Sequence, residues 1–108
     1  MVLSLYNDSE NNVWAGTYTG LNKFNRDSKT FSHYTKELND TASLSNNYVY
    51  SILQKDKDNL YIGTAGGLNI LNLKSDKVYV AKENSISASV INSMVLIGEK
   101  LWMGTNRG

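Results

Sequence analysis

The sequence repeats itself at a spacing of 47 residues, and this repeat restricts the fold more than any other feature of the chain. Sliding the sequence by 47 positions lays Val2–Asn25 over Val49–Asn72, and nine of those 24 positions are identical. A third copy begins near Ser93, because a shift of 41 residues lays Leu60–Gly67 over Leu101–Gly108. The chain therefore holds two complete units and about the first half of a third.

Each complete unit has the pattern of four short strands separated by polar turns. No segment shows sustained apolar spacing of three and four residues, so no helix longer than a turn is expected. The expected strands are Val2–Asn7, Val13–Thr17, Leu21–Asn25 and Thr30–Thr35 in the first unit, and Val49–Gln54, Leu60–Thr64, Leu68–Leu73 and Lys77–Lys82 in the second.

The second strand of each unit is apolar on both faces, as in Val13–Thr17, Leu60–Thr64 and Leu101–Thr105. A sheet with one solvated face would instead alternate apolar and polar residues. Four-stranded sheets covered on both faces, at a period of about 40–50 residues, are typical of propeller blades. The sequence thus predicts an all-β fold, a β-propeller fragment of about two and a half four-stranded antiparallel blades, with blades at residues 1–48, 49–92 and 93–108.

A closed propeller needs about four to eight blades, so this chain is expected to be one piece of a larger propeller domain. We therefore expect the rest of that propeller to be one of the partners that this chain contacts. Open blade faces and unpaired strand edges tend to recruit another chain. We therefore expect the 108-residue chain to self-associate through its exposed blade edges.

Composition excludes several classes of function. The formal net charge is +1, which argues against nucleic acid as a partner, because phosphate binding needs a basic surface. The chain has no Cys and one His, His33, so thiol chemistry and paired-His metal sites are absent. No apolar run approaches the ~20 residues of a membrane helix, and no signal peptide is visible. We expect no catalytic residues, no metal and no cofactor.

Two segments carry a resemblance to a known family. Asn12–Asn22 reads Asn-Val-Trp-Ala-Gly-Thr-Tyr-Thr-Gly-Leu-Asn, and Asp58–Asn69 reads Asp-Asn-Leu-Tyr-Ile-Gly-Thr-Ala-Gly-Gly-Leu-Asn. Both resemble the two-component regulator propeller repeat, and Ser43–Ile52 is similar to the family's approach to the first strand of a blade. The resemblance implies a non-catalytic sensor module on the periplasmic or extracellular side of a bacterial membrane. It also implies a bound signal molecule, in some members an oligosaccharide, and a separate output domain.

The loops that differ between the repeats are the candidate ligand-binding positions. They join the second strand to the third, or one unit to the next, and in propellers such loops share one face around the channel. We expect a carbohydrate or other small-molecule ligand there. The candidate contacts are Tyr18, Thr19, Ala65, Asn106 and Arg107, with the long connectors 36–47 and 83–92 beside them.

Other chemically suggestive residues have structural interpretations. Trp14, Tyr61 and Trp102 share one repeat position and are expected to pack between blades. The acids of the first turn of each unit, such as Asp8 and Asp56, suit a solvated turn better than a Ca²⁺ site. Two alternatives to a sensor remain open: a protein-interaction propeller without a small ligand, and a propeller lyase or glycosidase.

Overall fold

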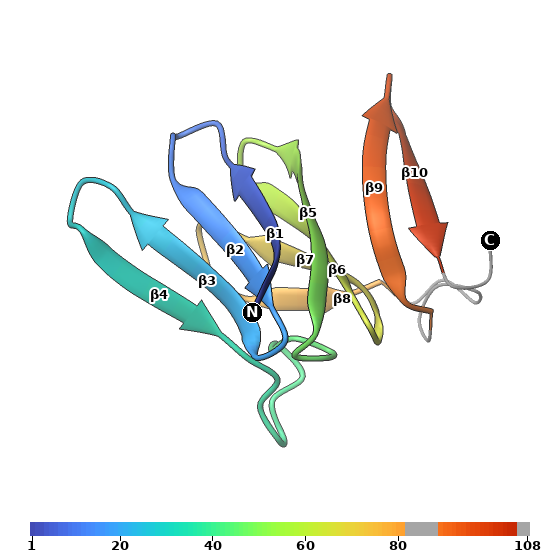
Figure 1. Ribbon diagram of the computed structural model, residues 1–108, viewed down its shortest axis with the longest axis horizontal. Helices are drawn as coiled ribbons and strands as arrows, with labels where there is room; N and C mark the ends of the chain where they lie inside the picture. Colours follow the sequence, from blue (N-terminus) through green and yellow to red (C-terminus); the bar gives the residue numbers. More distant parts are fainter. Residues whose placement is uncertain (82–88, 106–108) are drawn as a thin grey trace.

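The computed structural model describes residues 1–81 and 89–105, and within them every regular element is a β-strand (Figure 1). The strands form two four-stranded antiparallel sheets and one antiparallel hairpin. Blade 1 contains β1 (Val2–Asn7), β2 (Val13–Thr17), β3 (Gly20–Asn25) and β4 (Thr30–Tyr34). Blade 2 contains β5 (Val49–Asp56), β6 (Asn59–Thr64), β7 (Gly67–Asn72) and β8 (Val78–Val80), and the hairpin contains β9 (Ile91–Ile97) and β10 (Lys100–Thr105).

The strand predictions are confirmed to within a few residues. β5 extends to Asp56, two residues beyond the expected end, and β8 spans only Val78–Val80. The strand order within each sheet follows the chain, as expected for blades built from successive hairpins. The long connector between the blades covers residues 35–48, and residues 82–88 of the second connector lie outside the described residues.

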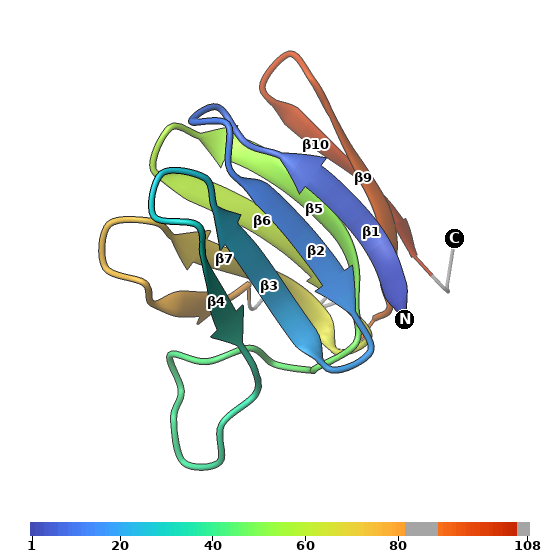
Figure 2. The ribbon, with the colours of Figure 1, turned by 60° about the vertical axis from the view of Figure 1, so that its left-hand side comes forward.

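The three sheets stand side by side, with β1 next to β5 and β5 next to β9 (Figures 1 and 2). We call the face of each sheet that turns toward the next sheet along the chain its forward face, and the opposite one its backward face. Apolar side chains fill the space between blade 1 and blade 2. This core consists of Trp14, Leu21, Leu44, Val49, Ile52, Leu60, Ile62, Leu71 and Val78.

A Ser–Gly pair recurs where the first two strands of each sheet meet. The pairs are Ser4 with Gly16, Ser51 with Gly63 and Ser93 with Gly104. Glycine is needed in the blades because the next sheet approaches closely. A Cβ on Gly63 would lie 2.8 Å from Cγ2 of Ile91, nearer than real Cβ atoms come to a neighbour. The expected role in tight blade packing is confirmed for Gly16, which approaches Val49, and for Gly63, which approaches Ile91.

The aromatic repeat position differs between its three copies. Trp14 is fully buried on the forward face of blade 1, and its indole N–H donates to Oδ2 of Asp8 at 2.7 Å. Tyr61 is half-buried, but Trp102 is 58% exposed. The prediction of a core position is confirmed for Trp14, whereas no described sheet covers the forward face of the hairpin, where Trp102 lies.

Candidate functional site: the loop face

Two short turns form the tips of the face predicted to bind ligand. In blade 1, the Thr17 hydroxyl accepts a hydrogen bond from the amide of Thr19 at 3.0 Å and donates to the carbonyl of Gly20 at 2.9 Å. Gly20 has φ of +125°, which side-chain-bearing residues rarely adopt. Threonine and glycine thus close the turn by themselves, which leaves residues 18 and 19 free to vary.

Blade 2 repeats the same turn. The Thr64 hydroxyl accepts from the amide of Gly66 at 3.0 Å and donates to the carbonyl of Gly67 at 2.8 Å. Gly67 again has a positive φ, of +112°. The Gly-Thr-x-x-Gly pattern is therefore a device that fixes the turn and presents two variable residues at its tip.

The end of the connector lies against the tip of blade 2. The amide of Ala65 donates to the carbonyl of Tyr48 at 3.0 Å, and the Ser45 hydroxyl donates to the carbonyl of Gly66 at 3.1 Å. Ser45 is held in turn by Asn69, whose side-chain oxygen accepts from the Ser45 amide at 2.9 Å. Residues 45–48 are thus anchored to blade 2.

Tyr48 brings a second aromatic ring to the tip of blade 1. Its ring meets that of Tyr18 edge to face, with centroids 5.1 Å apart and planes at 62°. Both rings remain accessible, Tyr18 at 39% and Tyr48 at 47%. Sequence reasoning missed Tyr48. The sequence feature that could have indicated Tyr48 as a binding residue is its place at the end of a variable connector, immediately before a strand.

Three of the five predicted ligand contacts can be placed. Tyr18 and Thr19 are exposed at the tip of blade 1, and Ala65 is partly buried at the tip of blade 2. Tyr48 touches both tips, so it joins these positions into one surface. Asn106 and Arg107 lie outside the described residues.

The connector also borders two open cavities, of about 170 Å³ and 550 Å³. The larger has a volume typical of small-molecule sites, which run from roughly 300 to 1,000 Å³. Its walls carry charged groups, hydroxyls and one exposed aromatic ring. They are Lys36, Glu37, Asp40, Thr41, Ser43, Leu44, Ser45, Tyr79 and Val80.

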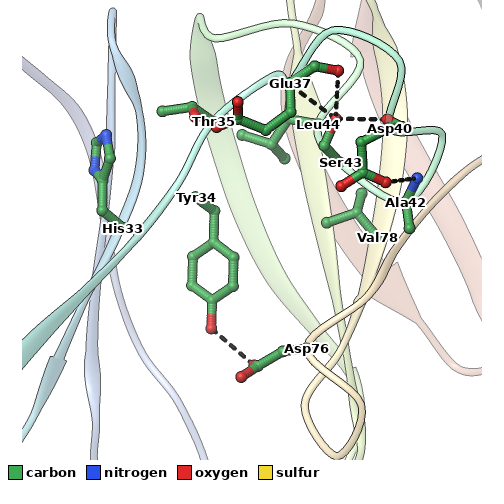
Figure 3. Close-up of a pocket in the computed structure, with 10 residues that line it drawn as sticks. All are labelled: His33, Tyr34, Thr35, Glu37, Asp40, Ala42, Ser43, Leu44, Asp76 and Val78. Atoms are coloured by element: carbon green, nitrogen blue, oxygen red, sulfur yellow. Dashed lines mark hydrogen bonds between the residues drawn. The ribbon is translucent and has the colours of Figure 1, made fainter.

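Hydrogen bonds within the connector hold these walls in place. The Ser43 hydroxyl accepts from the Glu37 amide at 2.9 Å, and Asp40 Oδ1 accepts from the Ala42 amide at the same distance (Figure 3). The Ala42 carbonyl accepts from the amide of Val78 at 3.0 Å, which ties the loop to the edge of blade 2.

The smaller cavity contains a hydrogen bond between the blades. The Tyr34 hydroxyl donates to Oδ1 of Asp76 at 2.9 Å (Figure 3). Burial raises the pKa of Tyr34, and its hydrogen bond to the Asp76 carboxylate raises it further. Tyr34 is therefore a neutral donor that links β4 to the β7–β8 turn, and a proton-transfer role at neutral pH does not suit it.

The remaining titratable candidates have structural partners. His33 is exposed, and its Nδ1 lies 2.7 Å from the amide oxygen of Asn22 on the neighbouring strand. Asp56 accepts hydrogen bonds from the Asp58 amide and the Asn59 side chain, and the backbone bond is the larger cause of its lowered pKa. Within residues 1–81 and 89–105, no three His, Asp or Glu side chains gather in a metal-binding group.

Parts of the chain are similar in sequence to known proteins. A sequence model of the two component regulator propeller matches residues 1–19 and 43–66, which confirms the resemblance drawn from the repeats. Histidine kinase P4 of Formosa agariphila is 32% identical over 73 residues, which is 65% of this chain and 5% of that protein.

A solved structure shows the same fold. It is the extracellular domain of a putative hybrid two-component system from B. thetaiotaomicron, with a TM-score of 0.78 and 22% identity. The alignment covers 99% of this chain and 14% of that one. The β-propeller architecture is therefore confirmed. In the described part of the chain, no helix has the length and apolarity needed to cross a membrane.

Proposed function

We propose that this chain, which carries two-component regulator propeller repeats, is a non-catalytic ligand-binding module of a bacterial sensor. The family match and the histidine-kinase relative support a sensor-type role. The extracellular location of the structural neighbour supports a place on the periplasmic or extracellular side of the membrane. The chain spans 5% of the relative and 14% of the neighbour, so membrane anchoring and the output domain belong to the proposal.

The ligand we propose is an oligosaccharide, and the Tyr18–Tyr48 pair is the observation that carries this choice. Two accessible rings meet at 62° on a face whose backbone is fixed by hydrogen bonds. Such rings offer apolar surface for the C–H face of a sugar and hydroxyls for its polar edge. Thr19 and Ala65 border the pair, and we propose Asn106 and Arg107 as further contacts by their place in the third repeat.

Signalling then requires that the ligand distinguish two arrangements of the blades. Tyr18 belongs to blade 1, whereas Tyr48 is hydrogen-bonded through its carbonyl to the tip of blade 2. A sugar that contacts both rings spans the junction between the blades. Binding would favour the arrangement in which the two tips stand as they do here.

The test is isothermal titration calorimetry with a panel of neutral and acidic oligosaccharides of graded length. Tyr18→Leu and Tyr48→Leu keep apolar bulk but remove the aromatic face, and each should weaken binding about tenfold, equivalent to roughly 1.4 kcal/mol. Phe31→Leu is the matched control, because Phe31 is a 75% exposed aromatic at the other end of blade 1.

Three results would count against the proposal. Binding that survives both tyrosine substitutions would place the ligand elsewhere. Binding to none of the panel would favour the protein-interaction scaffold. Release of new reducing ends from any saccharide would show that the module is an enzyme, of the lyase or glycosidase class.

A further inference from the structure

The side-chain amide of Asn46 is held in a fixed orientation at the loop face. Asn46 Oδ1 accepts a hydrogen bond from the backbone amide of Tyr48 at 2.8 Å, which closes a turn of the kind that asparagine favours. A backbone N–H only donates, so the side-chain oxygen must face Tyr48 and the side-chain nitrogen must face elsewhere. No described residue provides a hydrogen-bond partner for Asn46 Nδ2, and the residue is partly exposed. The turn therefore leaves both N–H donors of this nitrogen free.

Gly66 makes room for Asn46 at the tip of blade 2. A Cβ built on Gly66 would lie 3.1 Å from Asn46 Cβ and 3.5 Å from Asn46 Nδ2, so the asparagine lies directly against the glycine. The φ of Gly66 is not in the left-handed region, and the equivalent residue of blade 1 is Thr19. The turn by itself thus accepts a side chain at this position. Glycine at position 66 instead fits the close approach of Asn46.

Asn46 belongs to the same surface as the two tyrosines. Tyr48 lies two residues further along the connector, and its ring meets the ring of Tyr18 at 5.1 Å between centroids. The Tyr48 carbonyl accepts from the amide of Ala65, the residue before Gly66, at 3.0 Å. A short stretch of connector thus carries an aromatic ring to the tip of blade 1 and an amide donor to the tip of blade 2.

The free side-chain groups of this surface are mainly hydrogen-bond donors. Asn46 Nδ2 can only donate, and the two tyrosine hydroxyls can donate as well as accept. None of the residues that form the surface is acidic; they are Tyr18, Thr19, Asn46, Tyr48, Ala65 and Gly66. The neighbouring hydroxyls already bind backbone carbonyls; they are those of Thr17, Ser45 and Thr64. A charged oxygen is the strongest partner for such donors, because hydrogen bonds to an ionised acceptor are roughly twice as strong as those between neutral groups.

We propose that Asn46 determines the specificity of the oligosaccharide site, and that its amide donates to the carboxylate or sulfate group of an acidic sugar. This inference rests on the proposed function, because the rings of Tyr18 and Tyr48 must hold the sugar while the amide contacts its substituent. The amide is oriented before binding, so little side-chain freedom is lost when the ligand binds. A neutral sugar offers the same donors weaker acceptors, and it binds less tightly for that reason.

The first test measures matched pairs of saccharides by isothermal titration calorimetry. The pairs are oligogalacturonates and oligomannuronates with their carboxyl-reduced forms, and sulfated galactan oligosaccharides with their desulfated forms. In at least one pair the acidic member should bind about tenfold more tightly, as expected when a hydrogen bond gains a charged acceptor. A preference within the uronate pairs identifies a carboxylate as the group that Asn46 binds, and a preference within the galactan pair identifies a sulfate.

The second test removes the donor and keeps the turn. Asn46→Asp retains an oxygen that accepts from the Tyr48 amide, but it replaces the nitrogen with a second, negatively charged oxygen. Affinity for the preferred acidic saccharide should fall about tenfold or more, because a charge-assisted hydrogen bond becomes a repulsion. Affinity for the neutral member of the pair should change by about threefold at most. Circular dichroism checks that the strands are intact.

Asn47→Asp is the matched control. It adds the same charge one residue further along the connector, and it keeps the oxygen that accepts from the Lys36 amide at 2.6 Å. Its affinity for the acidic saccharide should fall by about threefold at most, because salt screens a charge that makes no direct contact with the ligand.

Three results would overturn this inference and leave the proposed function standing. They are equal affinity for both members of every pair, an Asn46→Asp variant that binds like the unaltered chain, and equal losses in the two Asp variants. The last result would assign the effect to added charge and not to the lost donor. Failure of every saccharide to bind would overturn the proposed function, and this inference with it.

Discussion

The hydrogen bond between Trp14 and Asp8 offers a quantitative test of how the first blade is held together. The indole N–H donates to Oδ2 of Asp8 at 2.7 Å, while Oδ1 accepts from the amides of Glu10 and Asn12 at 3.0 and 2.9 Å. The carboxylate therefore joins the β1–β2 turn to a ring that packs against blade 2. Trp14→Phe removes the N–H donor and leaves Oδ2 without it.

The expected loss of unfolding free energy follows from these contacts. A hydrogen bond to a charged acceptor contributes about 1.5–3 kcal/mol to stability. When the donor is removed and the acceptor stays buried, water cannot replace the lost hydrogen bond. Trp14 is fully buried and Asp8 is 7% exposed, so little water reaches either group. The smaller ring adds a cavity term of roughly 1 kcal/mol. Trp14→Phe should therefore cost about 3 kcal/mol.

A double-mutant cycle separates the hydrogen bond from the cavity. Asp8→Asn removes the negative charge but keeps a side-chain oxygen for the turn amides, and should cost about 1–2 kcal/mol. The double variant should cost less than the sum of the singles by about 1 kcal/mol, because they share one bond. Urea unfolding followed by far-UV circular dichroism measures all four proteins. Each protein is measured at several concentrations, so that any dependence of the unfolding free energy on association is seen directly.

Two results would refute this reasoning. Additivity within about 0.3 kcal/mol would show that the two side chains do not share a bond in solution. A Trp14→Phe cost below about 1 kcal/mol would show that the ring is not enclosed as described.

Two further predictions concern contacts between the blades. Ser51→Ala should lower the unfolding free energy by about 1 kcal/mol, because the Ser51 hydroxyl donates to the Ile91 carbonyl. Ser4→Ala should be nearly neutral, because the buried Ser4 hydroxyl has no hydrogen-bond partner among the described residues. Urea midpoints of the two variants check this, and equal losses would contradict it. Burial, then the hydrogen bond to Asp76, raises the pKa of Tyr34 above its ordinary value of 10.0, so the unfolded chain releases this proton first and stability should fall as pH rises above about 10. Tyr34→Phe should show a smaller fall between pH 9 and 11, and identical pH profiles would exclude this assignment.

The repeat alone determined most of the fold. Short strands between polar turns, Gly-Thr-x-x-Gly at the turns and second strands that are apolar on both faces are local signals, and each depends on a residue and its near neighbours. Because the signals recur in register, they predicted the strands of both blades and the propeller architecture. They also indicated the loop tips as the variable surface, where Tyr18 and Ala65 lie.

Only the stacking of the sheets decided which residues meet across that surface. Tyr18 and Tyr48 are 30 positions apart, on a turn and on a connector whose path no local pattern fixes, yet their ring centroids lie 5.1 Å apart. The stacking of the sheets also gives Trp14 and Trp102 different exposures. These residues share one repeat position, but blade 2 covers Trp14, whereas no described sheet covers Trp102, which is 58% exposed. Burial is a property of the neighbour as much as of the residue, so a repeated sequence can specify each blade, while only the assembled sheets determine which faces remain open.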